Sequence, residues 1–132
     1  MWALFCQSLV NGLQALSRED AAIWFFLAVA LPVSFYGLLR PGEWAKLRRR
    51  AVKLPSDALA AGRNAAVLSL ERPKNQAAMG RWQVTLIEHP TALAWLIWLC
   101  EGLDPESLVF PGGASKMRKH FAMLCQQMCL VP

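Results

Sequence analysis

The stretch that decides the fold covers residues 18–44 and reads REDAAIWFFLAVALPVSFYGLLRPGEW. Residues 21–39 carry no charged side chain, and an apolar run of this length without a polar face is typical of a helix buried on all sides. Ser17 and the acidic residues that follow it, Glu19 and Asp20, predict the N-terminal cap of this helix. We therefore expect a helix over residues 18–36, with a kink or an early end near Pro32, because proline removes a backbone donor.

The same run also has the length of a transmembrane helix, and the basic residues in 40–53 follow it as a cytoplasmic flank would. Pro32, Ser34, Tyr36 and Gly37 in its second half weigh against a membrane span. Hydropathy alone does not separate a membrane helix from a fully buried one. A small membrane-anchored helical protein is therefore kept as an alternative, although we expect no membrane partner.

Length and composition limit the class of protein. The chain has 132 residues, 55% hydrophobic and 17% charged, which is enough for a core and excludes a disordered tail. The net charge is +5, and residues 40–53 alone hold six basic residues and one acidic residue. This concentration of positive charge predicts an anionic partner such as nucleic acid. The N-terminus has neither the basic region nor the cleavage site of a secretory signal.

Hydrophobic periodicity predicts helices on both sides of the central run. In residues 2–16 the apolar side chains fall at helical spacing, so we expect Phe5, Leu9, Leu13 and Leu16 to face the core. A third helix is expected to begin at Pro41, because proline suits the first helical position. Its buried side would be Trp44, Leu47 and Val52, and its solvent side Lys46, Arg48, Arg49 and Arg50.

The rest of the chain predicts a β-hairpin and two more helices. Residues 66–70 and 82–86 have the apolar, partly alternating pattern of strands, and residues 71–81 would form a long basic hairpin loop. A helix is expected from Pro90 to Gly102 and a last one over residues 115–128. The first of these would bury Leu93, Leu96, Ile97 and Leu99. The order predicts a mainly α fold with a small antiparallel β-hairpin or sheet, the α+β class.

The cysteines and histidines indicate no metal site and no cofactor. The four cysteines are Cys6, Cys100, Cys125 and Cys129. They contain no Cys-x-x-Cys pair, and no histidine pair lies near them, which argues against zinc. We expect buried thiols in a reducing compartment. The isolated His89 and His120 receive no role.

Two residues have local settings that suit phosphate chemistry. Arg40 precedes the expected third helix, where free backbone N–H groups and the helix dipole favour an anion. An arginine there can bind a phosphate with two hydrogen bonds, and Glu43, one turn later, could hold its guanidinium. A surface Arg–Glu pair is the plain alternative. Lys74 in the hairpin loop could bind phosphate or donate a proton, or be an ordinary surface lysine.

Taken in order, several segments resemble the tyrosine recombinase (phage integrase) family. GLLRPGEWAKL at residues 37–47 resembles the family's first conserved box, Gly-Leu-Arg-x-x-Glu, with one extra leucine. LSL at 68–70, followed by Arg-Pro-Lys at 72–74, is similar to the hairpin that carries the family lysine. VTLI at 84–87 resembles the return strand of that hairpin. LVFP at 108–111 resembles the family's extended segment before its next helices. The similarity spans about residues 17–128.

The resemblance implies a site and a partner. Family members break and rejoin DNA through a covalent phosphotyrosine. Arg40 would then bind the scissile phosphate, Glu43 would support it, and Lys74 would protonate the departing sugar oxygen. Double-stranded DNA would be the partner, with a homo-oligomer on DNA, no small-molecule substrate, and a location with DNA in the nucleus or nucleoid. The DNA contacts would be Lys46, Arg48, Arg49, Arg50, Arg72 and Arg81.

The chain departs from the family pattern at two points. The second box, His-x-x-Arg, is absent, because His120 is followed by Phe-Ala-Met. Tyr36 is the single tyrosine, and it precedes Arg40 inside the apolar helix. We therefore expect residues 1–132 to form one truncated catalytic-type domain that binds DNA without cleaving it. A non-catalytic DNA-binding remnant of a mobile element is the second alternative.

Overall fold

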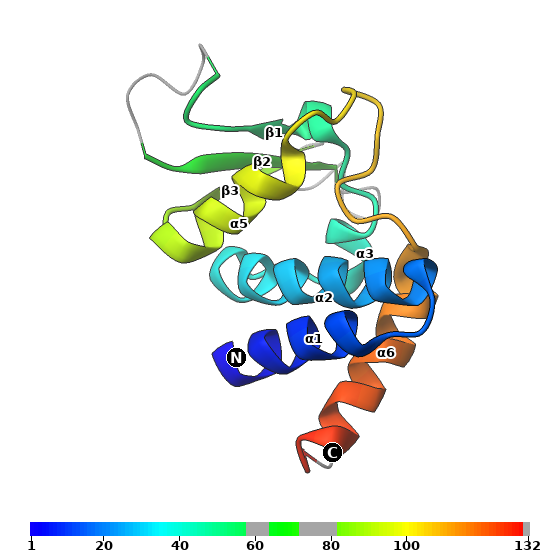
Figure 1. The fold of residues 1–132 in the computed structure, drawn as a ribbon. Helices are drawn as coiled ribbons and strands as arrows, with labels where there is room; N and C mark the ends of the chain where they lie inside the picture. Colours follow the sequence, from blue (N-terminus) through cyan, green and yellow to red (C-terminus); the bar gives the residue numbers. More distant parts are fainter. Residues whose placement is uncertain (58–63, 72–81, 131–132) are drawn as a thin grey trace.

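The computed structural model describes residues 1–57, 64–71 and 82–130. In these residues the chain is mostly helical, with one small sheet of three antiparallel strands, as Figure 1 shows. The expected α+β class is confirmed at this level. The elements in order are α1 (Trp2–Gln14), α2 (Arg18–Gly37), α3 (Pro41–Trp44), the 3-10 turn η1 (Arg49–Ala51), β1 (Val52–Lys53), β2 (Ala66–Glu71), β3 (Trp82–Ile87), α5 (Pro90–Cys100) and α6 (Gly113–Gln127).

α2 is the central element of the helical part. It lies between α1 on one side and α5 with the sheet on the other, and α6 crosses its N-terminal end (Figure 1). Nine of its 20 residues are buried. The Ser17 hydroxyl accepts a hydrogen bond from the Asp20 N–H at 3.1 Å, so the predicted cap is confirmed. The apolar run is therefore the core helix onto which the other elements pack.

α2 passes through Pro32 and ends only at Gly37. The expectation of an early end near Pro32 is wrong. Pro32 is fully buried, and the residues around it belong to the hydrophobic core. Burial of apolar surface on both sides of the proline outweighs the one backbone hydrogen bond that it cannot make.

By length and composition α2 is the one helix among the described residues that could cross a membrane. Half of its most apolar window is buried inside the protein. The core helix of a soluble protein meets the same criteria, so this feature gives only weak evidence for the membrane alternative.

The chain leaves α2 through a residue in the left-handed backbone region. Leu38 has φ 53° and ψ 43°, and the Ser34 carbonyl accepts the backbone N–H groups of both Leu38 and Leu39. A left-handed C-terminal cap usually falls on glycine, because a Cβ atom is strained there. The Leu38 side chain is 86% exposed, so little apolar burial compensates for this strain.

We expect Leu38→Gly to raise the free energy of unfolding by about 1 kcal/mol, because glycine adopts positive φ without a steric cost. Urea unfolding followed by tryptophan fluorescence measures the change. Leu38→Ala is the matched control, since it removes the same exposed side chain but keeps Cβ. A gain for alanine equal to that for glycine would show that backbone strain is not the cause.

The buried face of α1 differs from the expected one. Residues Phe5, Ser8 and Gly12 face the core, whereas Leu13 is 78% and Leu16 104% exposed. The Ser8 hydroxyl donates to the Trp24 carbonyl at 2.7 Å, and a Cβ on Gly12 would lie 3.0 Å from the Phe25 ring. α1 and α2 thus approach closely, and small residues rather than large apolar ones permit this contact.

The predicted β-hairpin is confirmed. β2 and β3 pair antiparallel, with Ala66 opposite Ile87 and Glu71 opposite Trp82. β1 adds a third strand, pairing Val52 with Leu68, and gives the order β1-β2-β3. The sequence did not indicate β1, because two residues are too few to show an alternating pattern.

The later helices and the third helix are close to their predicted positions. α5 begins at Pro90 and buries Leu93 and Leu96, but Ile97 is 40% exposed instead of buried. α6 covers nearly the expected residues. α3 begins at Pro41 as predicted but ends after one turn. Its continuation still buries Trp44, Leu47 and Val52.

All four cysteines are free, and their burial differs from the expectation. Cys100 is buried at the end of α5, whereas Cys6 and Cys129 are exposed and Cys125 is partly buried. The prediction of buried thiols is therefore confirmed for Cys100 alone. Within the residues that the structure describes, no group of three His, Cys, Asp or Glu side chains could hold a metal ion.

Candidate nucleic-acid interface

Arg40 stands directly before α3, at its N-cap position, and is exposed. The Glu43 N–H donates to the Arg40 carbonyl at 2.9 Å, and the Arg40 N–H donates to the Glu43 carboxylate at 3.4 Å. Glu43 therefore holds the backbone of this turn. The expectation that it holds the Arg40 guanidinium is corrected, since no described carboxylate lies within 4.0 Å of that group.

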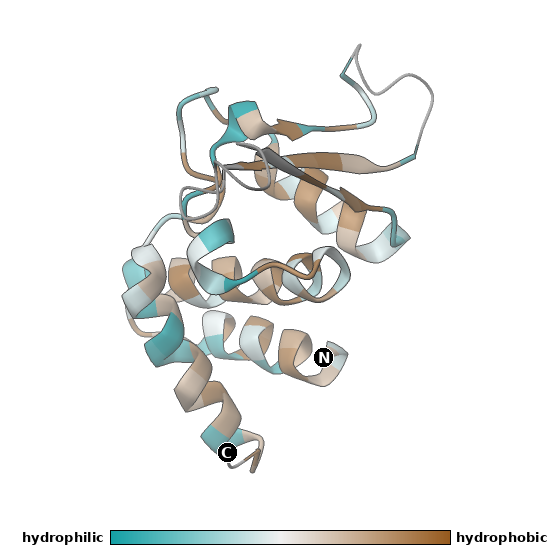
Figure 2. Cartoon of the chain, turned by 180° about the vertical axis from the view of Figure 1, so that it is seen from behind, coloured by the Kyte–Doolittle hydropathy of each residue, from teal (hydrophilic) through white to brown (hydrophobic). Residues whose placement is uncertain are grey.

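The basic segment after α3 is fixed to residues 105–110. The backbone N–H of Val109 donates to Leu47 at 2.9 Å, and that of Arg50 donates to Pro105 at 3.0 Å. The Trp44 and Phe110 rings meet edge to face, with centroids 5.6 Å apart. These contacts fix the backbone of the segment. Figure 2 shows that α3 and η1 both carry hydrophilic residues.

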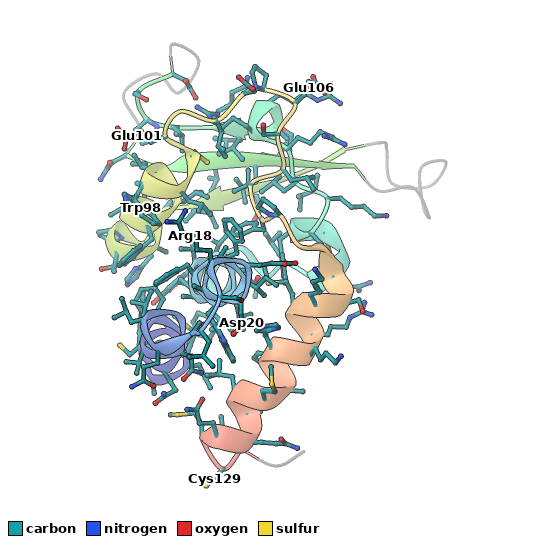
Figure 3. All side chains as sticks on the ribbon, turned by 45° about the vertical axis from the view of Figure 1, so that its right-hand side comes forward. Arg18, Asp20, Trp98, Glu101, Glu106 and Cys129 are labelled. Atoms are coloured by element: carbon teal, nitrogen blue, oxygen red, sulfur yellow. The ribbon has the colours of Figure 1, made fainter. Side chains whose placement is uncertain are left out.

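The basic side chains divide into surface and internal groups. Lys46, Arg48 and Arg50 are exposed. Arg48 donates to the Glu106 carbonyl, and Arg50 contacts the Glu106 carboxylate at 3.0 Å; Glu106 lies in the loop beside η1 (Figure 3). An exposed ion pair of this kind contributes little stability, so an incoming phosphate could replace it.

Arg49 faces inward, unlike its predicted solvent position. Its side chain is 20% exposed, and its guanidinium donates to the Val52 carbonyl at 2.7 Å. It also lies 3.8 Å from Asp57, whose carboxylate accepts the Leu54 N–H at 2.7 Å. Arg49 thus joins η1 to the loop after β1, and a phosphate could reach it only by breaking these contacts.

The hairpin is anchored next to Arg40. The Thr85 hydroxyl on β3 donates to the Gly37 carbonyl at 3.0 Å. A Cβ on Gly37 would lie 2.9 Å from Ile87 Cδ1, so the strand lies tightly against the end of α2. Three further predicted site residues, Arg72, Lys74 and Arg81, lie outside the described residues, as does the hairpin tip.

An additional cation stands near Arg40 that the sequence did not indicate. A groove of about 160 Å³ separates α3 from α6, and it is lined by Leu39, Pro41 and Trp44 on one side and Met117, Arg118 and Phe121 on the other. Arg118 is exposed. Arg118 is far from Arg40 in the sequence, so only the packing of α6 against α3 brings Arg118 to the groove beside α3.

Tyr36 and the two histidines have structural positions. The Tyr36 ring stacks on the His89 ring at 4.2 Å, and His89 Nδ1 accepts the Ala92 N–H at the start of α5. His120 is 7% exposed, and its Nε2 lies 2.8 Å from the Asp20 carboxylate. These residues join helices that are distant in the sequence, and none of them lies beside Arg40 in a contact that the structure records.

The chain matches no protein-family model, no curated protein and no solved structure. The resemblance to tyrosine recombinases therefore rests on the sequence motifs quoted above.

Proposed function

We propose that the chain is the front part of a tyrosine recombinase catalytic domain and binds double-stranded DNA through the face around Arg40. We call this face the basic face and define it by Arg40, Lys46, Arg48 and Arg50. The observation that carries the proposal is that the segments of the resemblance, separated along the chain, meet around the turn that contains Arg40.

Two contacts make this convergence. β3, the strand that resembles the family's return strand, is bound to Gly37 through the Thr85 hydroxyl. The 108–110 segment is bound to Leu47 by a backbone hydrogen bond and to Trp44 by an aromatic contact. Arg40 lies between these attachment points in the sequence, and its exposed guanidinium has no described carboxylate partner.

The charge of the basic face supports a polyanionic partner. Four exposed cations belong to it, whereas Glu43 is used on the backbone, and the neighbouring turn adds two exposed carboxylates, Asp104 and Glu106. Phosphate contacts of this kind position a protein on DNA without reading its sequence. In this proposal Arg40 binds a phosphate, Glu43 shapes its turn, and Lys74 keeps its proposed role as general acid.

DNA affinity is expected to fall steeply with salt. If the four cations of the basic face each neutralise one phosphate, raising salt from about 50 to about 200 mM weakens binding roughly a hundredfold, because counterion release scales with the number of contacts. Fluorescence anisotropy with a labelled duplex at several salt concentrations measures the slope. Absence of binding at low salt would contradict both the proposed recombinase fragment and the alternative of a non-catalytic DNA-binding remnant.

Paired variants locate the interface. Arg40→Gln and Lys46→Gln should each weaken binding and lower the salt slope by about one contact. Arg18→Gln is the matched control, because Arg18 is an exposed arginine at the start of α2 and does not belong to the basic face (Figure 3). An equal loss for Arg18→Gln would show a net-charge effect rather than the basic face.

The 132-residue chain is expected to form no covalent adduct with DNA. It contains no His-x-x-Arg box, and Tyr36 is stacked on His89. Without the nucleophile the covalent route is lost, and a missing charge clamp costs a further hundredfold or more. A suicide duplex followed by denaturing electrophoresis tests this, and any adduct would refute the expectation.

Recovery of the protein only in detergent-extracted membranes would instead favour the membrane-anchored alternative.

A further inference from the structure

α1 carries an apolar stripe on the face opposite α2. The stripe consists of Ala3, Cys6, Val10 and Leu13, at spacings of three, four and three residues. All four are exposed, Val10 at 42% and Leu13 at 78%. This is the heptad spacing by which two helices pack along a shared line. α2 covers the other side of α1, so in the described structure the stripe has no covering element.

The surroundings of the stripe restrict what can cover it. Residues 1–17 contain no charged side chain, so neither DNA nor a charged protein surface would find an ion pair there. Helices that lie in a membrane interface usually carry lysine or arginine on their polar face. Apart from the buried Ser8, the polar residues of α1 are amides instead, and Asn11 is already hydrogen-bonded to Gln127 of α6 at 2.7 Å. An uncharged apolar partner fits this surface best.

We propose that the stripe is the contact between two copies of this chain, with their α1 helices antiparallel. Antiparallel pairing places Ala3 against the partner's Leu13 and Cys6 against the partner's Val10. Each layer then combines a small side chain with a larger one, which fills the space between the helices evenly. Parallel pairing would set Leu13 against Leu13 at one end and Ala3 against Ala3 at the other. A two-fold axis satisfies the antiparallel order with one self-complementary surface.

The size of the stripe sets the strength of the contact. α1 has 13 residues and is about 20 Å long. A single helix face of this length buries less than the roughly 800 Å² per partner of a standard interface. The dimer is therefore weak and depends on concentration.

Sedimentation equilibrium of the full chain without DNA tests the contact. Between about 5 and about 500 µM the weight-average mass should rise from monomer toward dimer. Leu13→Arg should keep the protein monomeric throughout. Val84→Arg is the matched control, because Val84 is 61% exposed on β3, away from α1, and it should associate like the wild type. A chain that stays monomeric, or a Leu13→Arg variant that still dimerises, would overturn the proposal.

Disulfide trapping tests the orientation. In a background with all native cysteines changed to serine except Cys100, Ala3→Cys combined with Leu13→Cys should give a covalent dimer on oxidation. Each single variant should not, because in antiparallel helices two copies of the same residue lie about 15 Å apart. Crosslinking of the single variants would overturn the antiparallel order.

Two further measurements distinguish the dimer contact from a lipid-binding surface and from the DNA-binding basic face. Flotation of the monomeric protein with neutral phosphatidylcholine vesicles, lost in Leu13→Arg, would replace the second copy by a lipid surface and overturn the proposal. DNA anisotropy of Leu13→Arg should show the wild-type salt slope. The dimer contact and the basic face can therefore fail independently of each other.

Discussion

Replacing Phe110 with alanine is expected to lower the free energy of unfolding by about 3–5 kcal/mol. Phe110 is fully buried and meets the Trp44 ring at 5.6 Å. The substitution loses the burial of the ring and leaves a cavity between α3 and the 105–110 segment. Small domains are stabilised by only about 5–15 kcal/mol, so this change removes a large share of the total. Urea unfolding monitored by tryptophan fluorescence and circular dichroism measures it.

Phe121→Ala is the control for this result. It deletes the same side chain from α6, but Phe121 is 40% exposed, so the expected loss is about 1 kcal/mol or less. Similar losses at the two positions would show that Phe110 does not join α3 to the 105–110 segment in solution. If the Phe110→Ala protein is folded but loses affinity for DNA, the attachment of that segment also shapes the basic face.

The Cys100 thiol is expected to resist alkylation and to make the fold sensitive to alkaline pH. Burial raises its pKa from 9.0 to about 11, partly offset by the Arg49 charge nearby. At pH 8 its thiolate fraction is about a hundredfold below that of an ordinary thiol. Timed iodoacetamide labelling with peptide mass spectrometry should therefore modify Cys6 and Cys129 long before Cys100. In urea all four cysteines should react at similar rates.

The same shift sets the direction of the pH effect on stability. The folded pKa of Cys100 lies above the unfolded value, so its contribution is complete below pH 9 and is lost as pH rises toward 11. The loss is at most about 3 kcal/mol, the equivalent of two pKa units. Cys100→Ala should remove this component from the alkaline part of the stability profile. Fast labelling of native Cys100, or an unchanged profile in the alanine variant, would contradict the buried thiol.

Much of the local structure could be predicted because it depends on neighbours in the sequence. The Ser17 cap, the helix start at Pro41 and the β2–β3 pairing follow from capping residues and periodicity. Predictions failed where packing overrode these local rules. α2 continues through buried Pro32, and α1 turns Gly12 rather than Leu13 toward α2.

The candidate site was predictable only in part. The sequence placed Arg40 before a helix, and the structure keeps it there, exposed. It could not indicate that Glu43 binds the backbone, because the same spacing serves a side-chain pair equally well. Arg49 points inward because its guanidinium contacts the Val52 carbonyl and the Asp57 carboxylate. Hydropathy does not indicate these contacts.

The sequence by itself determined where most of the helices and the two hairpin strands lie, where the positive charge is concentrated, and that one long apolar helix is present. These properties depend on residues within one or two turns of each other. Tertiary structure decided which faces are buried and which distant groups meet, such as Asp20 with His120 or Gly37 with Thr85. The physical reason is that burial and hydrogen bonding reward contacts between surfaces that fit, and the fit of two surfaces is not encoded in the periodicity of either one.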